Sequence, residues 1–162
     1  MDSSSNYLNV DDSWISFVEE RLSAGQVVRY LSFRGVSMRP MLRQGKDSVE
    51  LSPLPEKIKK FDLPVYRRSD GKYVMHRVIA VKDDHYICLG DNTVGLEKVY
   101  PEQMIGVMSA FKRGAKRVEA DALGYRMYCR IWRLTHPFRK LLYKSKKRAY
   151  RWIKLLYKEK NR

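Results

Sequence analysis

The chain has 162 residues, of which 44% are hydrophobic and 31% charged, and it carries a formal net charge of +15 at pH 7. This length allows one domain of ordinary size with an appendage and excludes a second large domain. The hydrophobic fraction is sufficient for a core and excludes wholesale disorder. The two cysteines, Cys88 and Cys129, lack the spacing of a metal or redox pair, so we expect free thiols in a reducing compartment.

The start of the chain, residues 1–12, is polar and acidic and lacks the basic start and apolar run of a secretory signal. No stretch of the chain reaches about 20 mainly apolar residues without a charge, which a membrane-spanning helix requires. We therefore expect a protein that is not exported and that does not cross a bilayer.

A short amphipathic helix is predicted next, behind potential capping side chains at 11–13 and before Gly25. Its apolar residues recur at helical spacing: Trp14, Ile15, Val18 and Leu22. This pattern favours a helix that covers the edge of the core. A helix that faces a substrate or a membrane is the alternative.

From residue 27 to residue 111 the pattern changes to short apolar or alternating runs, which favours β-strands. Asp70-Gly71 is typical of a tight hairpin turn, and Asp83-Asp84 indicates a second. The predicted strands are 27–33, 48–51, 63–67, 73–81, 85–89 and 104–111. The predicted organisation is an N-terminal polar segment with its helix over 1–26, a β-rich domain over 27–120 and a basic helical tail over 121–162.

Nearly all of the excess charge lies in that tail. Residues 125–162 hold 14 Lys and Arg and one acid, Glu159, which makes a net charge of +13. Pro137 is placed to start the last helix. The apolar residues of this helix fall on one narrow face, Leu142, Ala149, Ile153 and Leu156, and aromatic residues lie at the margins of that face, Tyr150, Trp152 and Tyr157. Such a helix is typical of the bilayer interface. The tail predicts peripheral contact with an anionic membrane surface, and nucleic acid is the less favoured partner.

The most informative segment, residues 33–45, has the sequence Phe-Arg-Gly-Val-Ser-Met-Arg-Pro-Met-Leu-Arg-Gln-Gly. Ser37 is followed by Met38 and, two residues later, by Pro40. An ordinary interpretation is a serine in a turn before proline, because the residue before a proline is pushed out of the helical region.

Two further segments follow. Residues 73–79 have the sequence Tyr-Val-Met-His-Arg-Val-Ile, with His76 39 residues after Ser37. Alternation along a strand places His76 on the face of Val74, Val78 and Ala80, where a lone histidine is usually a half-buried structural residue. Gly90-Asp91-Asn92 by itself predicts only a turn. Glu97 lies six residues beyond Asp91.

In this order and spacing, the three segments resemble the signal peptidase and LexA-like clan of serine peptidases, and most closely the Ser-His signal peptidases of the endoplasmic reticulum, archaea and some Gram-positive bacteria. The resemblance covers residues 33–107. It implies a mainly β, coiled signal peptidase/LexA-like fold, with Ser37 as nucleophile and His76 as general base. It also implies an acid that orients His76, and both Asp91 and Glu97 are candidates. The substrate would be a peptide or leader segment, bound as an added strand.

The chemistry requires these residue types together. A serine hydroxyl is a poor nucleophile at neutral pH, and an imidazole can both take and return its proton. Many bacterial signal peptidases have a hydroxyl two residues before the nucleophile, whereas this chain has Gly35, which implies an oxyanion hole made of backbone alone. Gly35, Val36, Met38 and Pro40 are expected around the oxyanion and the substrate. The Gly-Asp expected after the proline departs from the family pattern as Gly45-Lys46-Asp47.

No cofactor or metal is expected. His85 and His136 lack ligands at zinc-like spacing, and the sequence has no phosphate-binding Gly-rich loop. The signal peptidases are anchored in the membrane and act on the exported side. Because this chain has neither a predicted membrane-spanning helix nor a recognisable export signal, we expect instead a cytoplasmic enzyme, peripheral at the inner membrane face.

Two alternatives stay open. The first is a non-enzymatic protein that binds nucleic acid or a membrane surface through the tail. The second is self-cleavage in the LexA manner at Ala24-Gly25, which the short tether to Ser37 disfavours.

Overall fold

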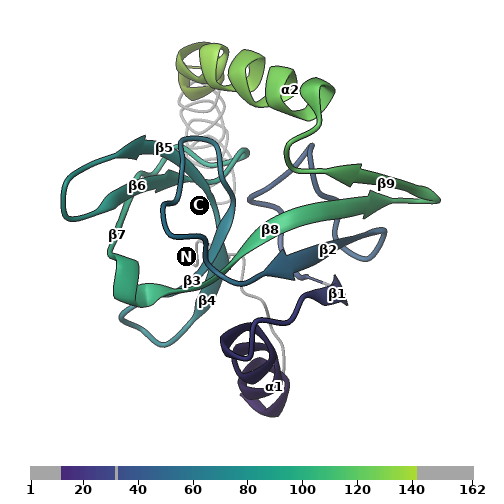
Figure 1. Ribbon diagram of the computed structural model, residues 1–162. Helices are drawn as coiled ribbons and strands as arrows, with labels where there is room; N and C mark the ends of the chain where they lie inside the picture. The colour runs from purple at the N-terminus through teal and green to yellow at the C-terminus, as the bar shows by residue number, and fades with distance from the viewer. Residues whose placement is uncertain (1–11, 32, 142–162) are drawn as a thin grey trace, which may run out of the picture. The chain divides into compact units, whose positions relative to one another are not determined.

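The structure is a computed structural model that describes residues 12–31 and 33–141. It is mainly β, with two antiparallel sheets, a short N-terminal helix and helix at the C-terminal end of the described region (Figure 1). The chain divides into two compact units, Met1–Met127 and Tyr128–Arg162. The candidate site lies in the first.

The N-terminal helix is confirmed as α1, Asp12–Ser23. Ile15, Val18 and Leu22 are buried, as the amphipathic pattern requires. The helix packs against strand β8 at Gly106, where a Cβ would lie only 2.6 Å from Leu22 Cδ1. Gly25 follows with a φ of 77° and donates its N–H to Leu22 O, which ends the helix.

The larger sheet is built around β8, Met104–Arg113. One side of β8 pairs with β2 along its length, and the other side is shared by β3 and β9. β1 lies beyond β2, and β4 lies beyond β3. The bounds of these strands are β1 Val28–Leu31, β2 Asp47–Ser52, β3 Pro64–Arg67, β4 Tyr73–Met75 and β9 Lys116–Glu119.

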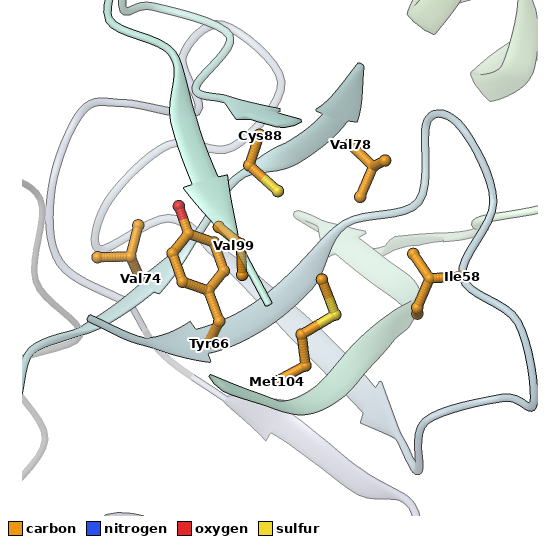
Figure 2. Close-up of a cluster of buried hydrophobic side chains, with 7 residues drawn as sticks. All are labelled: Ile58, Tyr66, Val74, Val78, Cys88, Val99 and Met104. Carbon is orange, nitrogen blue, oxygen red and sulfur yellow. The ribbon is translucent and has the colours of Figure 1, made fainter. Parts of the chain in front are cut away.

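The smaller sheet has the order β5-β6-β7. Its strands are β5 Arg77–Val81, β6 Tyr86–Leu89 and β7 Glu97–Val99, and a 3-10 turn, Pro101–Gln103, leads from β7 to β8. Figure 2 shows a cluster of buried side chains contributed by both sheets and by the segment before β3: Ile58, Tyr66, Val74, Val78, Cys88, Val99 and Met104. This shared core holds the two sheets together.

Each predicted strand segment contains a strand, and both predicted hairpin turns are confirmed. Arg68 N–H bonds Lys72 O around Asp70-Gly71, and Lys82 N–H bonds His85 O around the second turn. The segment predicted as one strand, 73–81, is instead two strands in different sheets, interrupted at His76. The short strands β7 and β9 were not predicted, because each is rich in charged residues and lacks a local apolar pattern.

The C-terminal helix α2 spans Leu123–Leu134, and helix resumes over 136–141, so Pro137 lies in its first turn as predicted. The apolar face predicted for the last helix, from Leu142 to Leu156, and the polar segment before residue 12 lie outside the described residues. Within residues 12–31 and 33–141, no helix combines the length and the hydropathy needed to cross a membrane. Cys88 and Cys129 are both buried free thiols.

Candidate active site

Ser37 lies in the loop between β1 and β2, and 5% of its surface is exposed. Within this loop, Ser37 lies in a tight turn that is closed by a hydrogen bond from Arg39 N–H to Val36 O at 3.1 Å, just after Gly35, whose φ of 109° favours glycine. The side chain of Met38 is buried beneath the turn, whereas Val36 and Pro40 are exposed. Thus the segment predicted around the nucleophile is anchored by Met38 and leaves Val36 and Pro40 accessible.

His76 is the single residue between β4 and β5, where the chain passes from one sheet to the other. Its Nδ1 lies 3.2 Å from the Tyr66 hydroxyl oxygen and 3.2 Å from Glu97 Oε1. Tyr66 donates its one hydroxyl proton to Glu97 Oε2 at 2.9 Å. Both partners therefore accept from His76, and we assign the ring proton to Nδ1. Nε2 then carries the free lone pair that a general base needs.

Gly90, just after β6, shows how close Ser37 and His76 are. A Cβ built on Gly90 would lie 2.9 Å from His76 Nε2 and 3.0 Å from both Ser37 Cβ and Ser37 O. The imidazole nitrogen and the serine side chain therefore both lie close to one point, and only a residue without a side chain fits there. In this structure, Ser37 Oγ does not donate a hydrogen bond to His76 Nε2. Catalytic hydrogen bonds are often long before substrate binds.

Glu97 begins β7 and receives hydrogen bonds from three side chains. Besides His76 and Tyr66, Arg68 binds it through Nε to Oε2 at 2.8 Å and through Nη2 to Oε1. Burial alone raises the carboxyl pKa, but the hydrogen bonds from His76, Arg68 and Tyr66 outweigh it and lower the pKa of Glu97 to about 2. Glu97 is thus ionised at neutral pH and aligned with the imidazole.

Asp91 has a different partner. Arg77 binds it with two parallel hydrogen bonds, Nε to Oδ1 and Nη2 to Oδ2, both 2.8 Å long, and each side chain is 3% exposed. Arg77 also donates to the Tyr125 hydroxyl at 2.8 Å and to Phe61 O at 3.3 Å. Of the two candidate acids, Glu97 contacts His76, whereas Asp91 ties β5 to the segment that follows β6.

Asn92 completes the Gly90-Asp91-Asn92 segment and holds the serine loop. Its backbone N–H donates to Ser37 O at 2.6 Å, and its side-chain Nδ2 donates to Val36 O at 3.2 Å. In a trans peptide the N–H points away from the C=O. Fixing Val36 O therefore also fixes the direction of the Ser37 N–H, which donates to no acceptor among the described residues. An oriented and unpaired N–H beside the serine fits an oxyanion donor.

The sequence analysis did not identify Tyr66 and Arg68 as site residues. They lie on and just after β3, 31 and 29 residues from Glu97, and no local pattern marks them. Arg77 and Asn92 had a local signal, because they adjoin His76 and Asp91 in the two motifs.

The described residues contain no cluster of three or more His, Cys, Asp or Glu side chains that could hold a metal ion. The arrangement comprises a serine, an imidazole with a free nitrogen, an ionised carboxylate and an unpaired N–H, which are the elements of nucleophilic acyl transfer. Comparisons with models of protein families, with curated proteins and with solved structures found no match to this chain.

Proposed function

We propose that this protein is a serine endopeptidase of the signal-peptidase type, with Ser37 as nucleophile, His76 as general base and Glu97 as the acid that orients it. One observation carries the proposal: Ser37 and His76 Nε2 flank Gly90, while His76 Nδ1 faces Glu97. Three residues distant in sequence are thereby aligned in the order that proton transfer from a serine requires.

In the proposed reaction, Ser37 Oγ attacks the carbonyl carbon of the scissile bond while its proton passes to His76 Nε2. The tetrahedral oxyanion binds the Ser37 N–H. Collapse breaks the C–N bond, and the leaving amine takes the proton from His76. Water then attacks the acyl-enzyme and gives a proton to His76, which returns it to Ser37 Oγ as the carboxyl product leaves.

The finer fold assignment, the coiled β-fold of the signal peptidase and LexA-like clan, is part of the same proposal. The mainly β architecture and the adjacency of the three resembling segments support it. The expected substrate is an extended peptide or leader segment that adds a strand to the sheet beside the site. The proposed location is the cytoplasm, at the inner membrane face.

The test is labelling with a fluorophosphonate, which is attacked by an activated serine and loses fluoride. We expect wild type to be labelled and to cleave a member of a peptide library, and Ser37→Ala and His76→Ala to do neither. Removing a positioned base costs about 10²- to 10⁴-fold in rate. Ser23→Ala and His85→Ala, at exposed and partly exposed positions, are matched controls and should behave as wild type.

Folded wild type that is neither labelled nor active contradicts the proposal, as does labelling that survives in Ser37→Ala. Intact mass after prolonged incubation tests self-cleavage at Ala24-Gly25 in the same samples. A clipped wild type and an intact Ser37→Ala would identify the chain as its own substrate.

A further inference from the structure

A surface of a different kind lies in the C-terminal unit, Tyr128–Arg162. Four large apolar side chains are exposed there: Ile131 by 55%, Leu134 by 74%, Phe138 by 71% and Leu141 by 66%. Leu123 and Met127, earlier in α2, are exposed as well. Hydrophobic residues that are exposed singly are normal, but a contiguous apolar surface marks an interaction site.

These four residues lie on one face of the helix. Their separations of three or four residues confine them to an arc of about 80° at 3.6 residues per turn. Hydrogen bonds from Thr135 N–H to Ile131 O and from Arg139 N–H to Thr135 O carry the helix through Thr135. We call this face, defined by Ile131, Leu134, Phe138 and Leu141, the apolar stripe.

The charged residues beside the apolar stripe are all basic. Helical spacing places Arg130, Arg133 and Lys140 on one side of it, and Arg139 with Trp132 on the other. The Arg139 guanidinium lies 3.8 Å from the Trp132 ring centre, and its Nη2 donates to Trp132 O at 2.6 Å. From residue 128 to residue 141 the sequence contains four basic residues and no Asp or Glu. An aromatic and basic border around an apolar strip matches the headgroup layer of a membrane.

We propose that the apolar stripe docks on an anionic membrane surface, with its apolar side chains at the acyl boundary and the flanking Arg and Lys among the lipid phosphates. The charge pattern favours lipid because it matches a surface that is negative throughout. Nucleic acid also offers phosphates, but it offers no apolar phase for Ile131, Leu134 and Leu141. Trp132, the residue best suited to stack on a base, is already stacked by Arg139.

The experiment measures co-sedimentation of the full chain with phosphatidylglycerol-containing vesicles, with pure phosphatidylcholine vesicles, and binding to a DNA duplex at equal ionic strength. The stripe variant is Leu134→Glu with Phe138→Glu, and Leu134→Gln is a milder second variant. Val81→Glu is the matched control, because Val81 is a 48% exposed apolar residue on β5. A charge variant, Arg130→Gln with Lys140→Gln, tests the basic border.

We expect wild type and Val81→Glu to bind anionic vesicles equally and the stripe variant to bind at least tenfold more weakly. The charge variant should lose affinity for anionic vesicles and leave the weak binding to phosphatidylcholine unchanged. Residues 142–162 are identical in all variants, so differences between variants report on the stripe. Circular dichroism confirms folding, and the substituted positions are exposed.

Equal vesicle binding by the stripe variant and Val81→Glu would overturn the inference. So would tight DNA binding by wild type without vesicle binding, which would assign the surface to nucleic acid. The inference stands independently of the peptidase proposal, because Ser37→Ala should bind vesicles as wild type does.

Discussion

At the scale of single residues, Gly90 links the three sequence segments that resemble signal peptidases, because it lies next to both Ser37 and His76. Its missing side chain leaves the space in which Ser37 and His76 Nε2 approach each other. As a turn residue alone, Gly90 would be replaceable at modest cost. As the spacer between the proposed nucleophile and the proposed base, it would not be replaceable.

Gly90→Ala tests this difference. The new Cβ would lie 2.9 Å from His76 Nε2 and 3.0 Å from the Ser37 backbone oxygen, so the serine loop or the imidazole must move. Because misplacement by about 1 Å can cost about 10²-fold in rate, we expect labelling of Ser37 to slow by about that factor. Gly95→Ala is the matched control, since a Cβ there meets nothing within 4 Å. Equal labelling rates in the two variants would show that Gly90 is only a turn residue.

At the scale of elements, the two carboxylates at the ends of the small sheet divide two tasks. Glu97, at the start of β7, aligns His76, whereas Asp91, after β6, neutralises the buried Arg77 of β5. A mutation at each position should therefore change a different property.

Glu97→Gln should lower the labelling and cleavage rates by about 10²- to 10⁴-fold with the fold retained, because the imidazole loses the charge that stabilises its protonated form. Asp91→Asn should instead destabilise the protein by about 3–5 kcal/mol, since it leaves Arg77 charged and buried. Urea unfolding and probe labelling of both variants separate the two effects. A stable but inactive Asp91→Asn beside an active Glu97→Gln would reverse the assignment.

At the scale of the whole molecule, most net charge lies in the tail, while four buried or partly buried acids of the β-domain form ion pairs with arginines: Asp47, Glu50, Asp91 and Glu97. Burial raises the pKa of Asp47, but hydrogen bonds from Arg43 outweigh it, and hydrogen bonds from Arg117 lower the pKa of Glu50. The pKa of Glu97 is lowered from 4.5 to about 2. The pKa of Asp62 is shifted in the opposite direction, because burial of its carboxyl raises it.

These shifts predict loss of stability in acid. A carboxyl whose pKa is lower in the folded chain stabilises it fully above the ordinary value of 4.5, and this contribution is lost as the pH falls toward 2. The free energy of unfolding of wild type should therefore fall between pH 4.5 and pH 2, and that of Glu97→Gln should fall less steeply. Urea unfolding at several pH values measures both slopes. Parallel curves for the two proteins would contradict the assigned ionisation of Glu97.

Local features follow from sequence patterns alone. The spacing of Ile15, Val18 and Leu22 predicted α1, and the turns at Asp70-Gly71 and Asp83-Asp84 predicted two hairpins, because such patterns depend only on near neighbours. The order of the Ser37, His76 and Gly90 segments also indicates a single site.

Features that depend on contacts between distant residues are visible only in the three-dimensional structure. The structure distinguishes between the two candidate acids for orienting His76, because the sheets bring Glu97 to His76 and Asp91 to Arg77. It added Tyr66 and Arg68, which meet Glu97 only after β3 packs beside the small sheet. It also divided the predicted strand 73–81 at His76, since the chain changes sheets there. The alternating pattern of a strand assumes that the strand stays in one sheet. The sequence pattern therefore could not predict the position of the His76 imidazole, which depends on the crossing of the chain between the sheets.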